Sequence, residues 1–578
     1  MNPYNDGGAD AHGIDNNPIN CANIRNIGIL STPAVDTATN FAYVVSATGP
    51  GGAHTFKLDA VDLITGTIAN DGGLPILADG DAGAILAPDG GTIAFEAGKH
   101  IQRPALALLK QNGKTYVIAA FSSSCDAPNP FYGWVLAFDV TTPSSPALTG
   151  IFNDSHNATS TPQGGIWQSG AGPAIDPQGN IYFLSGNGDG HDAGNVFSDS
   201  AFKLSIDSNG HFVQPTTSDA STYFTPTNWY DLQACDLDLG VSGITYIADN
   251  TTPMLLFGSK LGKAYLLNAN NLGGANPLDV KQAACVQLAT RKDNGTVCGG
   301  GLDASVTGVN ITQPSVRNCN DPNTQMPPKF TELVPCNLGT DSDGGPGSWP
   351  TTNCPSGQQV WPHIHGSPIF WANGPDAVFL GGQYDYIRRM DVDRTNHVFK
   401  DMTSNTYYAK DLPPNVGYGA LMSLADTLVG GVHKGVLFAN MQAPRSIAKA
   451  NNAAWPKHGL AELAYGGLYA IDATPSGGLY PTIPLLYRDD PTTDPLHHWI
   501  LSKFTTPTIY RGSVYVAAMS DELLVFGVDK DGDAIPDGID NCPTVANVDQ
   551  RNTNEDAERA GNQPLVGDAC DPNSSTAL

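Results

Sequence analysis

The sequence predicts an all-β fold: a β-propeller of seven blades, with eight as the alternative, followed by a short, loop-rich C-terminal repeat built around calcium. Three observations predict it. The 578 residues include 64 Gly and 43 Pro spread along the chain, which is typical of many short strands joined by turns. A strand pattern repeats along most of the chain. The C-terminal stretch 529–578 carries closely spaced aspartates.

The repeat gives the predicted fold its seven units. Each instance has a small residue, most often followed by proline, then an apolar alternation, a turn with Gly or Asn, and a second β-rich run. The instances begin at Ser31, Gln102, Gly172, Thr251, Gly366, Tyr418 and Thr505. One such unit cannot bury its apolar face alone, so the units must stack. A spacing of roughly 80 residues favours radial stacking in a propeller over a β-solenoid, whose repeats are shorter.

These signals divide the chain into three domains. Residues 1–24 form an N-terminal extension, 25–528 the propeller, and 529–578 the calcium-binding segment. Within the propeller, 281–362 is an insertion that holds five cysteines in a Gly-, Pro- and Asn-rich stretch. Such an insertion lies on a propeller face, where it either shapes the central mouth or is only a cross-linked loop.

Charge and cysteine usage bound the partners and the compartment. The net charge of -27 repels phosphate backbones, which argues against nucleic acid as a partner. No apolar run reaches 18 residues, so no membrane span is expected. The ten cysteines include no C-x-x-C pair, and their irregular spacing favours disulfides. We therefore expect a secreted protein, extracellular or at the cell surface, with the periplasm as the alternative.

The C-terminal segment predicts a calcium loop. Asp529, Asp531, Asp533, Asp537 and Asp540 stand at positions 1, 3, 5, 9 and 12 of a twelve-residue loop. This spacing brings oxygen ligands around one hard cation, as Ca²⁺ requires. The segment has few apolar residues, so it needs metal or a disulfide. A bridge between Cys542 and Cys570 would stabilise it by about 3–4 kcal/mol. The alternative is a solvated acidic linker.

Two sequence marks give this segment a resemblance to the thrombospondin type 3 repeat. They are Asp540-Asn-Cys-Pro and Gly567-Asp-Ala-Cys-Asp571. A second loop, with Asn552, Asn554 and Asp556 in its first acidic positions, departs from the pattern and is followed by an insertion. The resemblance implies a cell-surface or matrix partner bound through this repeat.

The most informative motifs within the repeats lie between residues 164 and 268. They read Gly164-Gly-Ile-Trp167, Ser185-Gly-Asn187-Gly188, Cys235-Asp236-Leu-Asp238 and Lys260-Leu-Gly262-Lys-Ala-Tyr265. In this order they resemble the motifs of pyrroloquinoline quinone (PQQ) alcohol dehydrogenases. The vicinal cysteines of that family are absent, and its metal-binding glutamate has no clear counterpart here.

The resemblance implies a role for each residue. Trp167 would lie under the quinone, and Asn187 would bind the Ca²⁺ of the cofactor. Asp236 would be the catalytic base, and Asp238 an extra metal ligand. Two cations, Lys260 and Arg103, would contact PQQ. Each residue also has a purely structural interpretation, in which Trp167 packs between blades and the others serve turns. His363 and His365 suggest a copper or zinc site as an alternative to the quinone site, although the sequence shows no third ligand for it.

Two functions follow as hypotheses. The first is an exported quinoprotein-like oxidoreductase, a PQQ-type dehydrogenase that oxidises a small alcohol or sugar with PQQ and Ca²⁺. The alternative is a non-catalytic extracellular or cell-surface propeller that binds a surface glycan or a matrix partner, with a calcium-stabilised tail. The order Asn187, Asp236, Asp238 and Lys260 favours the first; the missing cysteines and glutamate favour the second.

Overall fold

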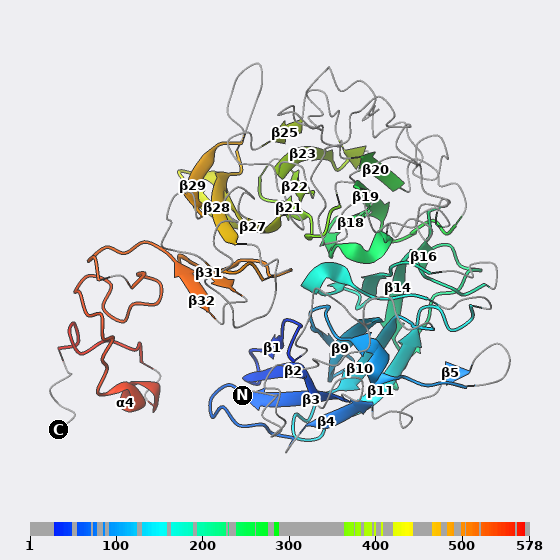
Figure 1. Ribbon diagram of the computed structural model, residues 1–578, viewed down its shortest axis with the longest axis horizontal. Helices are drawn as coiled ribbons and strands as arrows, with labels where there is room; N and C mark the ends of the chain where they lie inside the picture. The colour runs from blue at the N-terminus through cyan, green and yellow to red at the C-terminus, as the bar shows by residue number, and fades with distance from the viewer. Residues whose placement is uncertain are drawn as a thin grey trace. The chain divides into compact units, whose positions relative to one another are not determined.

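The fold is nearly all β, and most of its described residues lie in short antiparallel strands and the turns between them (Figure 1). The computed structural model describes residues 28–48, 55–70, 73–77, 85–86, 92–123, 130–158, 163–188, 194–226, 229, 238–260, 262–275, 283–287, 363–374, 376–382, 387–395, 398–399, 406–408, 420–442, 465–474, 483–490, 499–502, 504–518, 522–533, 535–560 and 563–572. Among these residues, no helix is long and apolar enough to cross a membrane. The all-β prediction is confirmed.

The first three large sheets each pair neighbouring strands antiparallel. The first contains β1 (Ala34–Asp36), β2 (Phe41–Thr48), β3 (Thr55–Asp62) and β4 (Leu74–Leu77). The second contains β7 (His100–Ile101), β8 (Ala107–Gln111), β9 (Lys114–Ser123), β10 (Trp134–Asp139) and β11 (Ala147–Asn153). The third contains β12 (Ala174–Ile175), β13 (Ile181–Leu184), β14 (Ala201–Ile206), β15 (Phe212–Val213) and β16 (Tyr223–Phe224). A small separate ribbon pairs β5 (Ile85–Leu86) with β6 (Thr92–Ile93).

The next four sheets continue the series along the chain. The fourth contains β17 (Ile244–Ile247), β18 (Met254–Gly258), β19 (Lys263–Asn268) and β20 (Ala283–Gln287). The fifth contains β21 (Ile369–Trp371), β22 (Ala377–Gly381), β23 (Ile387–Asp393), β24 (Val398–Phe399) and β25 (Thr406–Tyr408). The sixth contains β26 (Leu421–Val429), β27 (Val432–Gln442), β28 (Gly466–Asp472) and β29 (Leu485–Asp489). The seventh contains β30 (Thr508–Tyr510), β31 (Ser513–Ala517) and β32 (Leu523–Phe526).

Helical turns are few and short. Three 3₁₀ turns are η1 (Ala97–Lys99), η2 (Gln168–Gly170) and η4 (Leu239–Val241). The C-terminal segment contains the short helix α4 (Glu555–Ala560), which includes Asp556 of the second acidic loop and the start of the insertion after it.

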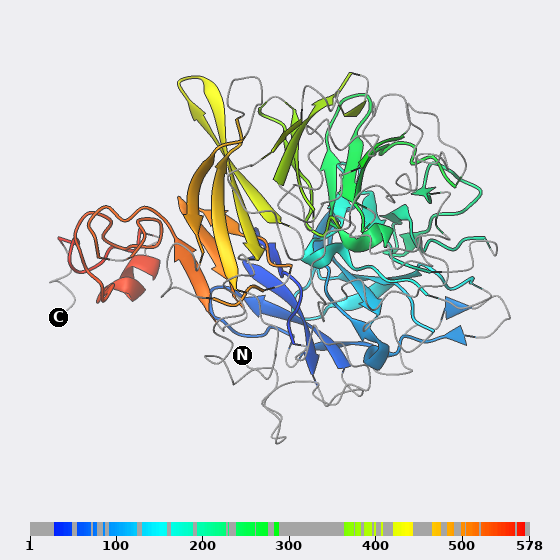
Figure 2. The ribbon, with the colours of Figure 1, turned by 45° about the horizontal axis from the view of Figure 1, so that its top comes forward.

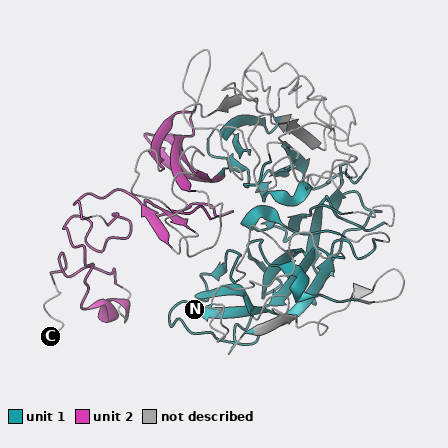
Figure 3. Cartoon of the chain, in the orientation of Figure 1, with its two compact units in different colours: residues 1–420, 477–482 teal, residues 421–476, 483–578 magenta. Residues whose placement is uncertain are grey.

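The chain divides into two compact units (Figure 3). One comprises residues 1–420 and 477–482, with the first five sheets; the other comprises 421–476 and 483–578, with the last two sheets and the C-terminal segment. This division runs through the predicted propeller. The predicted domain boundaries at residues 24 and 528 stay predictions, and the N-terminal extension lies outside the described residues. So does the predicted insertion 281–362, apart from β20.

Successive sheets share apolar cores because alternate residues of their middle strands point to opposite faces. On β10, Trp134 and Leu136 join a core with the first sheet, whereas Val135 joins a core with the third. On β18, Leu255 packs with the third sheet and Leu256 with the fifth. A middle strand buried on both faces reads as a continuous apolar run, which is how residues 254–257 read in the sequence.

The predicted repeats mark sheet beginnings. The starts at Ser31, Gly172, Gly366, Tyr418 and Thr505 each precede the first strand of a sheet. Gln102 precedes β8, which follows β7 along the same edge of β9, and the start at Thr251 is out of phase because it precedes β18, the second strand of its sheet. First strands of successive sheets lie against each other, β12 on β17 and β17 on β21 in one unit, and β26 on β30 in the other.

The sixth sheet begins with a long hairpin, drawn in yellow in Figure 2. Its strands β26 and β27 meet at Gly430 and Gly431, whose φ angles of 59° and 81° are those that a tight two-residue turn requires. Leu428, Val429 and Val432 at its tip are exposed.

Candidate functional site

A polar cluster forms where segments from three consecutive sheets meet. Its members lie at strand ends rather than within strands, in the connections that the structure describes before or after β8, β12, β13, β17 and β18. They are Arg103, Trp167, Asn187, Asp238 and Lys260, all of them predicted site residues. The structure therefore brings together most of the predicted quinone site. Asp236, the predicted catalytic base, lies outside the described residues.

The centre of this polar cluster is the buried carboxylate of Asp238. Its Oδ2 lies 2.5 Å from Lys260 Nζ, and its Oδ1 accepts a hydrogen bond of 2.7 Å from the Asn187 backbone N–H. The Lys260 backbone N–H also donates to the Asp238 carbonyl, at 3.1 Å. A buried carboxylate is stable only when such partners compensate it. Both oxygens of Asp238 thus serve contacts within the chain.

Trp167 forms the second half of the cluster together with Arg103. The Arg103 guanidinium carbon lies 4.8 Å from the centroid of the Trp167 ring, in a cation–π contact. Its Nε also donates to the Trp167 carbonyl, at 3.3 Å. Both side chains are half-buried, so each keeps an exposed part. Trp167 therefore packs beneath an arginine of its own chain.

Two glycines allow the halves of the cluster to approach. A Cβ added at Gly186 would lie 2.5 Å from Asp238 Oδ1 and 2.8 Å from Trp167 Cδ1. At Gly165 it would lie 2.9 Å from Trp167 Nε1. The Gly186 N–H donates to the Gly165 carbonyl, at 2.8 Å, which ties the two segments together. Close packing around Trp167 thus explains the glycines at positions 165 and 186.

The turn that follows Trp167 has an uncommon backbone. Gln168 and Ser169 have φ angles of 40° and 44°, a region that non-glycine residues seldom occupy. The Ser169 hydroxyl donates to the Val241 carbonyl of η4 and both side chains are buried. These contacts hold the turn of Trp167 against the turn of Asp238. The sequence carried no signal for them, because Ser169 and Val241 are far apart along the chain.

Asp154 is a further residue that the sequence does not reveal. Its carboxylate is fully buried, and Oδ1 accepts a hydrogen bond of 2.8 Å from the Gly133 N–H. A Cβ at Gly133 or Gly164 would lie 2.2 or 2.4 Å from its oxygens, so only glycine fits there. No basic side chain pairs with Asp154 among the described residues. Burial raises the pKa of Asp154 to about 7.

The histidine pair is placed beside the fourth sheet. The rings of His363 and His365 lie 5.5 Å apart in an edge-on arrangement, and the Ile364 N–H between them donates to the Ser259 carbonyl, at 3.1 Å. Within the described ranges, the one group of three side chains placed to share a metal ion is elsewhere, in the C-terminal segment.

That group is Asp529, Asp531 and Asp533, whose ligand oxygens lie within 4.8 Å of one another. Two ligands of one Ca²⁺, each about 2.4 Å from the ion, can be no more than about 5 Å apart. The spacing therefore fits a single ion. Partial desolvation raises the pKa of Asp531, and the carboxylates of Asp533 and Asp540 add to the rise.

The two remaining loop positions differ in what they contact. Asp540 is nine-tenths buried; its Oδ1 accepts from the Cys542 N–H, at 2.7 Å, and its Oδ2 is buried with no hydrogen-bond partner among the described residues. Asp537 instead contacts Lys530, with Oδ2 2.5 Å from Nζ, and this hydrogen bond lowers the pKa of Asp537. Asp540 thus keeps a buried oxygen without a partner among the described residues, whereas Asp537 is held by a lysine.

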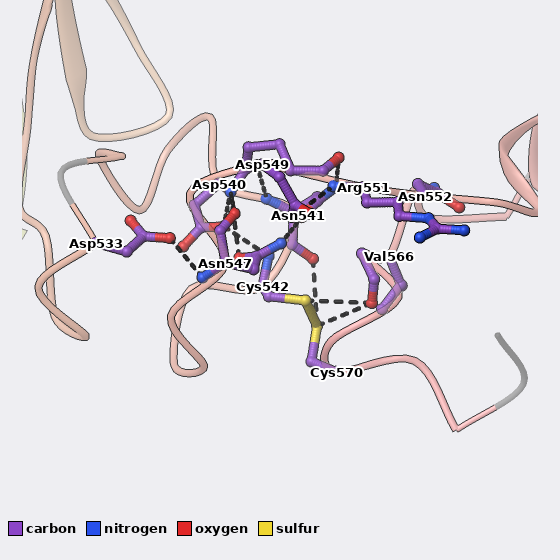
Figure 4. Close-up of a disulfide and its surroundings, with 12 residues drawn as sticks. Asp533, Asp540, Asn541, Cys542, Asn547, Asp549, Arg551, Asn552, Val566 and Cys570 are labelled. Atoms are coloured by element: carbon purple, nitrogen blue, oxygen red, sulfur yellow. Dashed lines mark hydrogen bonds between the residues drawn. A yellow bond between two sulfur atoms is a disulfide. The ribbon is translucent and has the colours of Figure 1, made fainter.

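A disulfide joins Cys542 to Cys570, as the sequence analysis expected (Figure 4). Around it, polar side chains replace an apolar core. The Asn547 N–H donates to Asp533 Oδ2, at 2.8 Å, and links the disulfide region to the aspartate group (Figure 4). In the second acidic loop, Asn554 donates to Asp571, at 3.0 Å, and Asn552 to Glu558, at 2.8 Å.

Comparison with known proteins gives a limited result. No family model and no curated protein matches the chain. Similar solved structures include Sqt1 from Saccharomyces cerevisiae, at 7% identity and a TM-score of 0.40, covering 87% of this chain and 83% of that one. Another is Chaetomium thermophilum Sqt1 bound to the N-terminus of the ribosomal protein L10, at 11% identity and a TM-score of 0.32, covering 89% and 98%.

These findings correct several predictions. No family model matches the chain, so the predicted membership of the PQQ alcohol dehydrogenases, and of the thrombospondin type 3 repeats, is wrong. The predicted oxidation of an alcohol or sugar with PQQ is wrong with it. In the structure Asp238 is paired with Lys260, and the half-buried Trp167 ring lies against Arg103.

The predicted partners and location are corrected on the same finding. One Sqt1 structure is bound to the N-terminus of the ribosomal protein L10, and nothing in the comparisons supports a small alcohol, a glycan or a secreted or cell-surface location. At TM-scores below 0.5, however, the similarity does not transfer the partner of Sqt1 to this chain.

Proposed function

We propose that this chain is a non-catalytic binding protein, in which a propeller of seven blades presents a polar face to a protein partner and a C-terminal segment is stabilised by Ca²⁺. The seven sheets of three to five strands, with cores shared between neighbours inside each unit, support the propeller.

The observation that carries the proposal is the pairing of Asp238, the predicted extra metal ligand. A carboxylate that ligates a metal turns an oxygen toward the ion. Both oxygens of Asp238 accept from Lys260 and Asn187, at 2.5 and 2.7 Å. The same pairing makes the cluster a rigid support for the half-exposed Trp167 and Arg103, and these two residue types are enriched at the energetic centres of protein interfaces.

A photo-crosslinking phenylalanine analogue tests the binding face. We would place it at position 103, beside Trp167, and in a matched variant at Asn209, an exposed loop residue of the same unit. In extracts of the native source, adducts with one protein partner should form from position 103 and not from 209. Equal labelling from both positions, or none from 103, would refute the proposed face.

The Ca²⁺ proposal rests on two independent features of the C-terminal segment. The oxygens of Asp529, Asp531 and Asp533 lie close enough to share one ion. The buried Oδ2 of Asp540 has no hydrogen-bond partner among the described residues, and its carboxylate acts on Asp531. Ca²⁺ would neutralise this group and replace the apolar core that the segment lacks.

Calorimetric titration of the full chain with CaCl₂ tests this site. We expect one tight event that is lost in Asp531→Asn and kept in Asp549→Asn, a matched change at an exposed aspartate of the same segment. Chelation should also speed proteolytic cleavage after residue 528, while the seven sheets before that residue, called the β body below, resist cleavage. Titration heat that is unchanged in Asp531→Asn would refute the site.

A further inference from the structure

Among the described residues, the seventh sheet ends at its third strand. It consists of β30, β31 and β32, whereas each of the other six large sheets has at least four strands. In the sixth sheet, the fourth position is filled by β29. Within the described ranges, no strand pairs with the free edge of β32, which is labelled in Figure 1. An unpaired edge offers a row of backbone donors and acceptors to another extended chain.

The register shows which backbone groups face outward. The Ala518 N–H donates to the Glu522 carbonyl, at 2.9 Å, so these two residues form a hydrogen-bonded pair next to the ends of β31 and β32. Hydrogen-bonded and non-bonded pairs alternate in an antiparallel ladder. Leu524 and Phe526 therefore bond to Val516 and Val514. The N–H and C=O groups of the other two residues, Leu523 and Val525, point to the free edge.

The side chains at this edge are apolar. Leu523 is 64% exposed, and Val525 is half-buried. On the opposite face, Leu524 and Phe526 pack with the core of the sixth and seventh sheets, where the Phe526 and Trp499 rings are 5.8 Å apart. A fourth strand with apolar residues at alternate positions would extend that core.

The negative charge near β32 favours some extended partner segments over others. The strand is preceded in the sequence by Asp521 and Glu522, and the whole chain carries a net charge of -27. An acidic segment would be repelled, and a basic one attracted. The C-terminal segment turns away from this edge: the Asp537 N–H donates to the Val528 carbonyl, at 2.7 Å, and Pro536 lies against Gly527, both beyond the end of β32.

We propose that the free edge of β32 binds an extended segment of a partner protein, by strand addition, and that this segment has alternating apolar residues and a basic residue opposite Glu522. Backbone bonds to Leu523 and Val525 supply part of the affinity, and the row of Leu524 and Phe526 sets the apolar positions. This surface lies in a different unit from Trp167 and does not depend on the proposed function.

The first test asks whether the edge is open in the full chain. Hydrogen exchange of single amides, with Ca²⁺ present throughout, should be fast at Leu523 and Val525 and slow at Leu524 and Phe526. Slow exchange at all four amides would show that the chain covers its own edge, and would overturn the proposal.

The second test measures binding of a fluorescein-labelled peptide, Lys-Thr-Val-Thr-Val-Thr-Val-Lys, by anisotropy. Val525→Pro removes an outward N–H without removing a bond of the ladder, because proline is tolerated at a sheet edge. We expect its affinity to fall at least about tenfold, and that of the matched variant Val525→Thr to be unchanged. Equal affinity of Val525→Pro and Val525→Thr, or no binding of the peptide, would overturn the proposal.

Reversing the charge at position 522 distinguishes strand addition from nonspecific binding. Glu522→Lys should weaken binding of the lysine peptide and strengthen that of the same peptide with glutamates at both ends. If both peptides respond alike to Glu522→Lys, the contact opposite Glu522 does not exist and the proposed partner chemistry is wrong.

Discussion

Replacing Asp154 by asparagine should remove a pH-dependent weakness from the β body. The carboxylate is fully buried with no basic partner among the described residues, and burial raises its pKa from 3.8 to about 7. Between these values the folded chain binds a proton that the unfolded chain does not. The free energy of unfolding therefore falls as the pH rises from about 4 to about 7, and it is level above that.

The magnitude follows from the pKa. One pKa unit corresponds to about 1.4 kcal/mol, so the full rise of the Asp154 pKa costs about 4 kcal/mol of stability above pH 7. Asparagine carries no charge, and its amide oxygen can accept the bond that the Gly133 N–H gives the carboxylate, at 2.8 Å. The free energy of unfolding of Asp154→Asn, relative to that of the native chain, should thus increase as the pH rises.

Urea unfolding followed by tryptophan fluorescence, at several pH values from 4 to 8.5, measures this gain. Asp62→Asn is the control of opposite sign, because a backbone hydrogen bond from Ile64 lowers the pKa of Asp62, and this exposed carboxylate stabilises the fold once ionised. If the stability difference between Asp154→Asn and the native chain is the same at pH 4 and pH 8.5, the argument from burial is wrong.

Three further predictions concern packing and cross-links. Lys260→Met leaves the buried Asp238 carboxylate without its cation and should cost about 2–4 kcal/mol by urea unfolding; adding Asp238→Leu should recover most of it, and no recovery would contradict the pairing. Gly186→Ala places a methyl group 2.5 Å from Asp238 Oδ1 and should cost about 1–3 kcal/mol in the same assay, so a neutral result would exclude the tight packing. Cys542→Ser should remove about 3–4 kcal/mol from the C-terminal segment alone, seen as faster proteolysis after residue 528 with an unchanged melting temperature of the β body; a lower melting temperature would mean that the two are not separate.

The strand content of the fold could be predicted because it depends on local patterns. Proline before an apolar alternation marks a strand start wherever the chain needs no backbone donor. The start at Thr251 was out of phase because Thr251-Thr-Pro253 precedes a middle strand, and the pattern alone does not tell a first strand from a second. Whether the sheets close into a ring depends on contacts far apart in sequence, which no single repeat carries.

The candidate site was predicted in its members but not in its chemistry. Glycines at 165 and 186 occur in the motif of a cofactor site, and the same glycines are needed where Trp167 packs against Asp238. The same glycine pattern is therefore compatible with a cofactor site and with close side-chain packing. Asp154 could not be predicted at all, because its neighbours Gly133 and Gly164 come to it only through the fold. The aspartates at 529, 531 and 533 could be, because their contacts are local.

The C-terminal segment has two fastenings that answer to different conditions. The disulfide closes residues 542–570, and the aspartate group lies before that loop, next to the end of β32. A chelator that removes the proposed Ca²⁺ would loosen the aspartate group and leave the disulfide intact. A reductant would open the disulfide and leave the aspartate group in place. The hydrogen bond from the Asn547 N–H to Asp533 joins the disulfide region to the aspartate group, so a change in one region would reach the other through this bond.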